Sequence, residues 1–114
     1  MTDKVIVLVT CESAAQAGEI AETVIGERLA ACVNVMPGIR SCYIWEGKQT
    51  WSEEVLLLIK TTRGAFAALR ERILALHSYA TPEIVCVPIV DGLSRYLDWI
   101  DQSVGKIKGR SPIS

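Results

Sequence analysis

The sequence predicts an α+β fold whose elements follow the order β-α-β-β-α-β, with one further helix near the C-terminus. Two runs, at residues 5–9 and 55–59, are apolar at every position, which is typical of strands buried on both faces. Apolar residues recur at helical spacing in residues 14–29 and 63–77, which lie between strand-like segments. These observations predict two central strands packed against amphipathic helices.

The first helix begins at a polar cap. Ser13 stands at the N-cap position and Gln16 follows three residues later, a pairing that predicts a capping box. We expect this helix to cover residues 14–29. Gly26 weakens it by about 1 kcal/mol relative to Ala, so either close packing or a frayed last turn is expected there.

A long β-hairpin follows the first helix. Residues 30–46 read as a strand that is interrupted by Pro37 and Gly38, which predict a bend or bulge in an edge strand. Residues 46–49 supply the turn and residues 50–61 run back. At about 3.3 Å per residue, each arm spans on the order of 40 to 50 Å, more than a domain of this size covers. The distal aromatic residues therefore predict contact with another chain: Tyr43, Trp45 and Trp51.

The second helix begins after Thr62, its expected N-cap, and has His77 in its last turn. Residues 78–83 connect this helix to the next strand, and Pro82 favours an extended conformation at Thr81. The apolar face of the helix is predicted to consist of Phe66, Leu69, Ile73 and Leu76.

The fourth strand is predicted over residues 84–90. It contains Pro88, which has no backbone N–H to donate, so the strand belongs at a sheet edge. Ser94 is expected to cap a last helix, and residues 105–114 form a short polar tail. The order is that of a ferredoxin-like fold, with the first and third strands central, the second and fourth at the edges, and helices on one face.

Length and composition predict a single soluble, cytoplasmic domain over residues 1–114. The chain has 12 Lys and Arg, 13 Asp and Glu, and a formal net charge of −1. Because no run of like charge occurs, we expect no nucleic-acid partner and no membrane partner. The apolar content is above that of an average soluble domain, which favours contact between subunits. No leader-like segment or membrane span is apparent.

The four cysteines are widely spaced and form no C-x-x-C pair, so the sequence predicts neither a zinc knuckle nor a redox dithiol. We expect small buried thiols in a reducing compartment. They are Cys11, Cys32, Cys42 and Cys86.

No catalytic motif is complete, so the sequence predicts a protein that is not an enzyme. His77 has two explanations: an imidazole that offsets the negative end of a helix dipole, or a ligand. Together with the thiol of Cys11 it would suit copper or zinc. Lys60 either pairs with a nearby carboxylate or lines a subunit cleft with Tyr79 and Glu83. The aromatic residues Tyr43, Trp45, Trp51 and Trp99 favour core and interface packing over stacking on a base.

Several motifs in order give the chain a family resemblance. They are Glu27-Arg28-Leu29-Ala30-Ala31-Cys32-Val33-Asn34, Tyr43-x-Trp45-x-Gly47, the segment from Glu53-Glu54 to Ile59-Lys60-Thr61, and Tyr79-x-Thr81-Pro82-Glu83. Over residues 5 to about 103 the chain resembles the CutA divalent-ion tolerance family. The resemblance implies a homotrimer that exchanges long hairpins, a cleft at each subunit boundary, and a link to tolerance of copper and other divalent ions. It also implies a structural likeness to the trimeric nitrogen-regulatory signal transducers.

The family's copper site, as the resemblance implies it, uses a Cys directly before the Thr that ends the first strand and two adjacent His residues after the second helix. Here Val9 precedes Thr10, and Leu76 precedes His77. Cys11 follows Thr10, and strand alternation turns it to the side of Val9.

Two functions follow from the residues and the resemblance. The first is a homotrimeric copper-tolerance protein with weak metal binding at His77 and Cys11. The alternative is a trimeric small-molecule sensor that uses the inter-subunit cleft, with the candidate ligand residues Lys60, Tyr79, Thr81, Glu83, Trp99, Tyr43 and Trp45.

Overall fold

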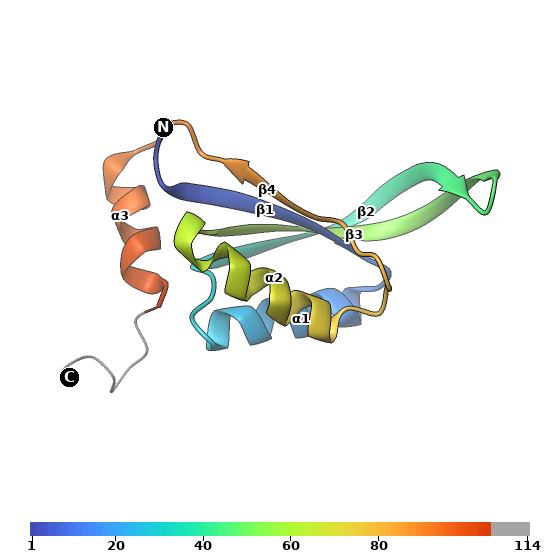
Figure 1. The fold of residues 1–114 in the computed structure, drawn as a ribbon, viewed down its shortest axis with the longest axis horizontal. Coiled ribbons are helices and arrows are strands. Elements are labelled where there is room, and N and C mark those ends of the chain that lie inside the picture. Colours follow the sequence, from blue (N-terminus) through green and yellow to red (C-terminus); the bar gives the residue numbers. More distant parts are fainter. Residues whose placement is uncertain (106–114) are drawn as a thin grey trace.

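The computed structural model describes residues 1–105. Their elements follow the predicted order, β-α-β-β-α-β with one further helix (Figure 1). The predicted polar tail lies outside the described residues except for Gly105. The elements are β1 (Lys4–Cys11), α1 (Ala14–Gly26), β2 (Cys32–Trp45), β3 (Lys48–Thr62), a 3-10 turn (Arg63–Ala65), α2 (Phe66–Leu76), β4 (Ile84–Pro88) and α3 (Ser94–Ser103).

The strands form one antiparallel sheet in the order β2-β3-β1-β4. The prediction that the first and third strands are central is therefore confirmed. Pro37 and Pro88 both lie in edge strands, as their missing backbone N–H requires. Within β4, Pro88 is the last residue, so this strand is two residues shorter than predicted.

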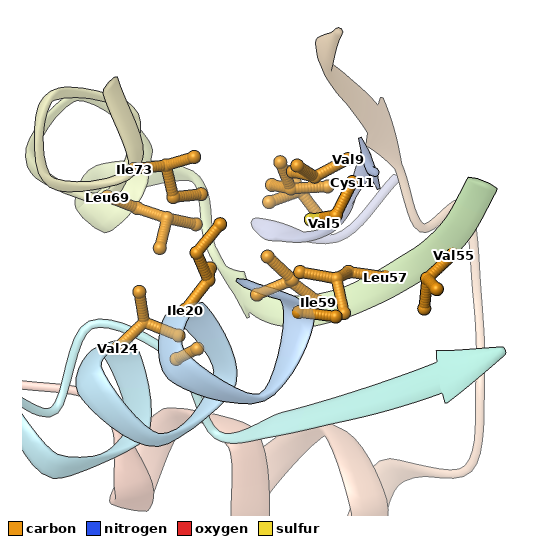
Figure 2. Close-up of a cluster of buried hydrophobic side chains, with 13 residues drawn as sticks. Val5, Val9, Cys11, Ile20, Val24, Val55, Leu57, Ile59, Leu69 and Ile73 are labelled. Atoms are coloured by element: carbon orange, nitrogen blue, oxygen red, sulfur yellow. The ribbon is translucent and has the colours of Figure 1, made fainter. Parts of the chain in front are cut away.

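One face of the sheet is covered by α1 and α2, which lie side by side beneath it (Figure 1). Alternate residues along the middle of the central strands point into this layer and are buried, whereas their neighbours Ile6, Leu8, Leu56 and Leu58 are only partly buried. Figure 2 shows the resulting core, in which the strand side chains meet Ile20 and Val24 of α1 and Leu69 and Ile73 of α2. The buried apolar residues of the strands are Val5, Val7, Val9, Cys11, Val55, Leu57 and Ile59.

The ends of α1 are fixed by backbone geometry and one cap. Ser13 Oγ accepts the backbone N–H of Gln16 at 3.1 Å, so the N-cap prediction is confirmed. The helix ends at Gly26 rather than at residue 29, because Arg28 adopts a left-handed conformation with φ 61°. Its N–H and that of Leu29 turn back to carbonyls of the last turn, closing a Schellman motif. A Cβ at Gly26 would meet no atom within 4 Å, so close packing does not explain this glycine.

The hairpin of β2 and β3 extends well beyond the helix layer (Figure 1). Its turn consists of Glu46 and Gly47, both with positive φ, and is two residues shorter than predicted. The pairing register shifts between Met36 and Ile39, which confirms the predicted bulge at Pro37 and Gly38. The radius of gyration is 15.3 Å, above the roughly 13 Å of a compact chain of this length. The protruding hairpin accounts for this excess.

Two helix starts differ from the sequence prediction. Thr62 caps the 3-10 turn that precedes α2, with its hydroxyl accepting the N–H of Ala65. Ser94 is the first residue of α3 and not its cap, because Leu93 holds the N-cap position without a side-chain hydrogen bond. Both helices still begin within a few residues of the expected points.

The other face of the sheet is apolar and is not covered by α1 or α2. Residues that pair across the strands point to the same face, so Ile6 and Leu8 of β1 lie with Leu58 of β3 and with Val85 and Val87 of β4. The two valines are 45% and 40% exposed, which is high for β-branched residues in a strand. We call this surface, together with Met36 and Leu56, the open face.

Candidate functional site

A pocket of about 690 Å³ lies where the hairpin leaves the body of the sheet. It is bordered by the end of β1, the proximal part of the hairpin and the loop that follows α2. Thr10 and Glu54 face it from the same side of the sheet as Leu56, so the pocket continues the open face. Its lining residues are Thr10, Ser41, Cys42, Tyr43, Trp45, Glu54, Tyr79, Ala80, Thr81 and Glu83.

The carboxylate of Glu54, on β3, connects β2 with the loop after α2. Ser41 Oγ of β2 donates a hydrogen bond to Glu54 Oε1 at 2.6 Å. Tyr79 Oη, from the loop after α2, donates to Glu54 Oε2 at 2.8 Å. Each carboxylate oxygen therefore has one donor, and the carboxylate is held in a single orientation.

Tyr79 is half-buried, and its phenol remains a donor. Burial raises its pKa above the ordinary value, and the hydrogen bond to Glu54 raises the pKa further, because a phenolate beside a carboxylate is unfavourable. The phenol is therefore protonated throughout the physiological range. Tyr43, beside it in the lining, donates its own hydroxyl to Ser52 Oγ at 3.1 Å.

His77 has a structural role in this loop. It directly follows α2 in an extended conformation, rather than lying in the last helical turn, and is 9% exposed. The backbone N–H of Tyr79 donates to His77 Nδ1 at 3.0 Å, so the proton must be on Nε2, which donates to the Thr10 carbonyl at 2.8 Å. Both ring nitrogens are thus occupied, and the imidazole ties the loop to the end of β1.

A second tie comes from α1. Gln16 Nε2 donates to the Leu76 carbonyl at 3.2 Å, and Gln16 Oε1 accepts the N–H of Ser78 at 2.7 Å. The side chain thus satisfies two backbone groups at the end of α2 instead of completing the predicted capping box. Together, Gln16 and His77 place Tyr79 over Glu54.

Cys11 lies with Val9 in the core, as strand alternation predicts. Burial, and then the nearby carboxylate of Glu54, raise the pKa of its thiol to about 11. The thiol is therefore protonated near neutral pH, whereas metal ligation requires the thiolate. Among residues 1–105, no group of three or more His, Cys, Asp or Glu side chains is placed to hold a metal ion.

Of the predicted cleft residues, the structure brings together Tyr43, Trp45, Tyr79, Thr81 and Glu83. The remaining two, Lys60 and Trp99, lie elsewhere in the chain. Lys60 pairs with Cys32 at the other end of β3, about 20 Å from Glu54 at the strand rise per residue. Trp99 is on α3, stacked on Tyr96.

Among residues 1–105, Lys60 forms no ion pair with a carboxylate, so the alternative expectation for it is not met in this part of the chain. Its ammonium group is hydrogen-bonded to Asn34 and lies 3.9 Å from the sulfur of Cys32. Both partners stand on β2, the neighbouring edge strand. The carboxylates near it in sequence, Glu53 and Glu54, lie toward the hairpin and out of its reach.

Sequence reasoning did not place Glu54 at the centre of the site, and it omitted Ser41, Cys42 and Thr10. The strand register would have identified Ser41, because Ile39 pairs with Glu54 and Ser41 pairs with Ser52. Serine and glutamate thus stand diagonally on one face of the hairpin. The bulge and the uncertain turn length hid this register in the sequence.

No helix among the described residues is long and apolar enough to cross a membrane. The cysteines are free thiols, and of the four only Cys11 is fully buried; Cys32 and Cys86 are partly buried and Cys42 is exposed. The expectation of four buried thiols therefore holds fully for Cys11 alone.

Comparison with known proteins agrees with this fold. A sequence profile of the family described as "CutA1 divalent ion tolerance protein" matches residues 5–103. A curated protein named divalent-cation tolerance protein CutA, from Thermus thermophilus, is 49% identical over 100 residues, covering 88% of this chain and 97% of that protein. Two plant relatives with chloroplastic CutA names, from Arabidopsis thaliana and Oryza sativa, are 40% and 42% identical. The chain spans about half of their length, 54% and 56%.

Solved structures give the same result. The CutA structure from Xylella fastidiosa superposes with a TM-score of 0.89 at 39% identity, covering 90% of this chain and 99% of that chain. The CutA1 structure from Oryza sativa gives 0.88 at 40% identity, covering 91% and 95%. A structure from Archaeoglobus fulgidus, titled a periplasmic divalent cation tolerance protein, gives 0.85 at 40% identity, covering 88% and 97%. With a family profile that matches from β1 to the end of α3 and relatives of this identity, the chain belongs to the CutA1 divalent ion tolerance family.

Proposed function

We propose that the protein acts in tolerance of divalent metal ions as a homotrimer and that it binds ligands rather than catalysing a reaction. The observation that carries this proposal is the open face. Val85 and Val87 are about two-fifths exposed and lie beside Leu8 and Leu58. A contiguous apolar surface of this kind is typical of an interface with another chain.

The hairpin gives the same indication from a different part of the chain. Ile44, Trp45 and Trp51 are 69%, 62% and 55% exposed in the isolated chain. Large apolar residues at the tip of an extended strand pair are typical of interface anchors. The resemblance to the family implies that the assembly has three subunits and that neighbouring subunits exchange hairpins.

Oligomeric state tests the first part of the proposal. Light scattering coupled to gel filtration is expected to give three times the 12.5 kDa of one chain. Leu58→Glu, which places a charge on the open face, should dissociate the assembly. The matched control is Leu74→Glu, at an exposed leucine of α2 on the other side of the molecule. A monomeric wild-type protein would overturn the trimer.

Growth of a host that lacks its own copy of the gene tests the second part. Expression of the wild-type chain should raise the copper or zinc concentration at which growth is halved, and Leu58→Glu should abolish the gain if the trimer is the active form. Equal growth with and without the wild-type chain would contradict a role in metal tolerance.

Direct copper binding at His77 and Cys11 is a separate part of the proposal. A copper ion at His77 has to displace the N–H of Tyr79 or the carbonyl of Thr10, so binding should be weak. Calorimetric titration of the wild type and of His77→Ala measures this site. Unchanged copper binding in His77→Ala would rule out His77 as a ligand.

A second candidate function, a trimeric small-molecule sensor, is favoured by the pocket around Glu54. Its volume lies within the usual range for small-molecule sites, about 300–1,000 Å³, and its polar groups are fixed by the hydrogen bonds of Ser41 and Tyr79. Any saturating ligand should raise the melting temperature, because a ligand at about 100 times its dissociation constant stabilises by about 2.7 kcal/mol. No shift with any metabolite of a broad screen would count against this function.

We also propose a reducing location, the cytoplasm, because Cys42 is an exposed free thiol and the other cysteines are unpaired. Thiol labelling of freshly lysed cells should find all four cysteines reduced. Oxidised cysteine in that sample would place the protein in an oxidising compartment.

A further inference from the structure

The residues around Glu54 give the pocket a definite charge. Glu54 and Glu83 both line it, and none of the lining residues is Lys, Arg or His. None of the ion pairs among residues 1–105 involves either glutamate. Arg40, on the adjacent part of β2, stacks on Trp51 at 4.7 Å and points to the opposite face of the hairpin. Lys48 shares the face of the pocket but stands nearer the turn, paired with Trp45. Among residues 1–105, no cationic side chain therefore lines the pocket itself.

Aromatic rings form the rest of the wall. Tyr43 and Trp45 project from β2 on the same face as Ser41 and Glu54, because residues two apart in a strand share a face. Both rings are largely exposed in the isolated chain, at 41% and 62%, so a ligand in a cleft at the subunit boundary can contact their π surfaces. The rings of Trp and Tyr attract a cation placed over them, and an adjacent carboxylate strengthens that attraction.

We propose that this pocket binds a small organic cation, a protonated or quaternary amine, with its charged nitrogen between Glu54 and the rings of Tyr43 and Trp45. The proposal rests on the sensor function proposed above and names the ligand class of that site. A phosphate or carboxylate ligand is disfavoured, because both ionised side chains that would meet it are carboxylates.

A bare metal ion fits the pocket less well. Hard divalent cations take six or more oxygen ligands at short distance, whereas both oxygens of Glu54 are already engaged by Ser41 and Tyr79. Aromatic rings are not ligands for such ions, and a volume of about 690 Å³ suits an organic molecule. An amine with methyl or methylene groups uses both the rings and the carboxylate.

The experiment is a calorimetric titration with a matched pair of probes. Choline carries a quaternary nitrogen, and 3,3-dimethylbutanol has the same shape with a neutral carbon in its place. The wild-type protein should bind choline saturably and the neutral probe about tenfold more weakly or worse, because only the cation gains from the rings and Glu54. Equal affinity for the two probes would overturn the proposal, as would an absence of binding by choline, tetramethylammonium and cadaverine alike.

Two variants locate the site. Glu54→Gln removes the charge but keeps a side chain of the same size, and should weaken choline binding by about tenfold or more. Trp45→Leu removes the ring and should have a similar effect. The matched control is Glu53→Gln, one residue away in β3 but paired with Arg40 on the other face of the hairpin, which should bind choline like the wild type. Unchanged choline binding in Glu54→Gln would show that the cation does not bind at Glu54.

Two further measurements separate the possible failures. The molecular mass is determined on the same samples. If the trimer is intact but binds no amine, only this inference is contradicted. If the protein is a monomer, the proposed trimeric sensor function is contradicted as well. Titration with MnCl₂ and CuCl₂ is run in parallel. Binding of a metal ion that is lost in Glu54→Gln, without amine binding, would identify a metal site and overturn the organic-cation proposal.

Discussion

The two faces of the sheet are built from residues of nearly the same hydrophobicity, yet the chain buries only one of them. On the face covered by α1 and α2, Val7 and Leu57 are fully buried, whereas on the open face their neighbours Leu8 and Leu58 remain partly exposed. Strand alternation separates the two sets residue by residue. The difference leaves an apolar face beside the layer covered by α1 and α2, and it is on this face that we propose a second subunit packs.

The functional residues follow the same division. Cys11 faces the covered side and is fully buried, while Thr10, one residue earlier, faces the pocket. Glu54 and Val55 are divided in the same way on β3. A site on the open face is accessible in the isolated chain and lies where a second subunit is expected to pack.

The largest expected effect is on the covered face. Leu57→Ala should lower the free energy of unfolding by about 3 kcal/mol, because it leaves a cavity that α1 and β1 cannot close. Urea denaturation at fixed protein concentration measures the loss. The matched control is Leu58→Ala, where we expect a smaller loss within the chain and a weaker assembly that dissociates on dilution. Equal losses without dissociation in Leu58→Ala would mean that the open face is not an interface.

Cys11 gives the covered face a pH dependence. Burial, and then the carboxylate of Glu54, raise the pKa of this thiol in the folded chain to about 11, above the ordinary value of 9.0 that applies in the unfolded chain. The contribution of this thiol to the free energy of unfolding is fully present below pH 9.0. It should fall by about 2 kcal/mol as the pH rises to about 11, because the thiol of the unfolded chain loses its proton first. Denaturation curves between these pH values should show the loss in the wild type and a flatter dependence in Cys11→Ala. An identical slope in the variant would contradict this assignment.

How far the sequence predicts the fold depends on which interactions are local. The bulge at Pro37 and Gly38, the cap at Ser13 and the edge position of Pro88 were predicted correctly, since each depends on backbone chemistry within a few residues. The end of α1 was predicted three residues too late. Glycine or asparagine usually marks a left-handed residue after a helix, and here that residue is Arg28, which gives no such indication in the sequence.

The site was only half predictable for a related reason. Tyr79, Thr81 and Glu83 stand in one loop, so their proximity follows from the sequence. The role of Glu54 depends on the loop crossing the end of β1, and His77 and Gln16 fix that crossing through contacts more than sixty residues apart in the chain. Contacts at such separations are set by tertiary packing and leave no periodic pattern.

The contact of Gln16 tests how firmly the helix layer fixes the pocket loop. Gln16→Ala removes two hydrogen bonds to backbone groups after α2 and should lower stability by about 1 kcal/mol. Hydrogen exchange should show faster exchange of the Ser78 amide, which has lost its acceptor. Gln16→Glu, which keeps the acceptor for Ser78 and loses the donor to Leu76, is the control and should protect that amide. Unchanged exchange in Gln16→Ala would show that the loop is held by His77 alone.

The smallest effect is expected at the end of α1, where the helix layer turns back toward the sheet. Arg28 has φ 61°, a conformation that is unfavourable for residues with a Cβ. Arg28→Gly removes this strain but increases the entropy of the unfolded chain, so we expect a net gain of about 0.5 kcal/mol in urea denaturation. Arg28→Ala keeps the strain and should not gain. A gain of equal size in Arg28→Ala would trace the effect to the arginine side chain, whereas a gain only in glycine assigns it to the backbone turn that ends the covered layer.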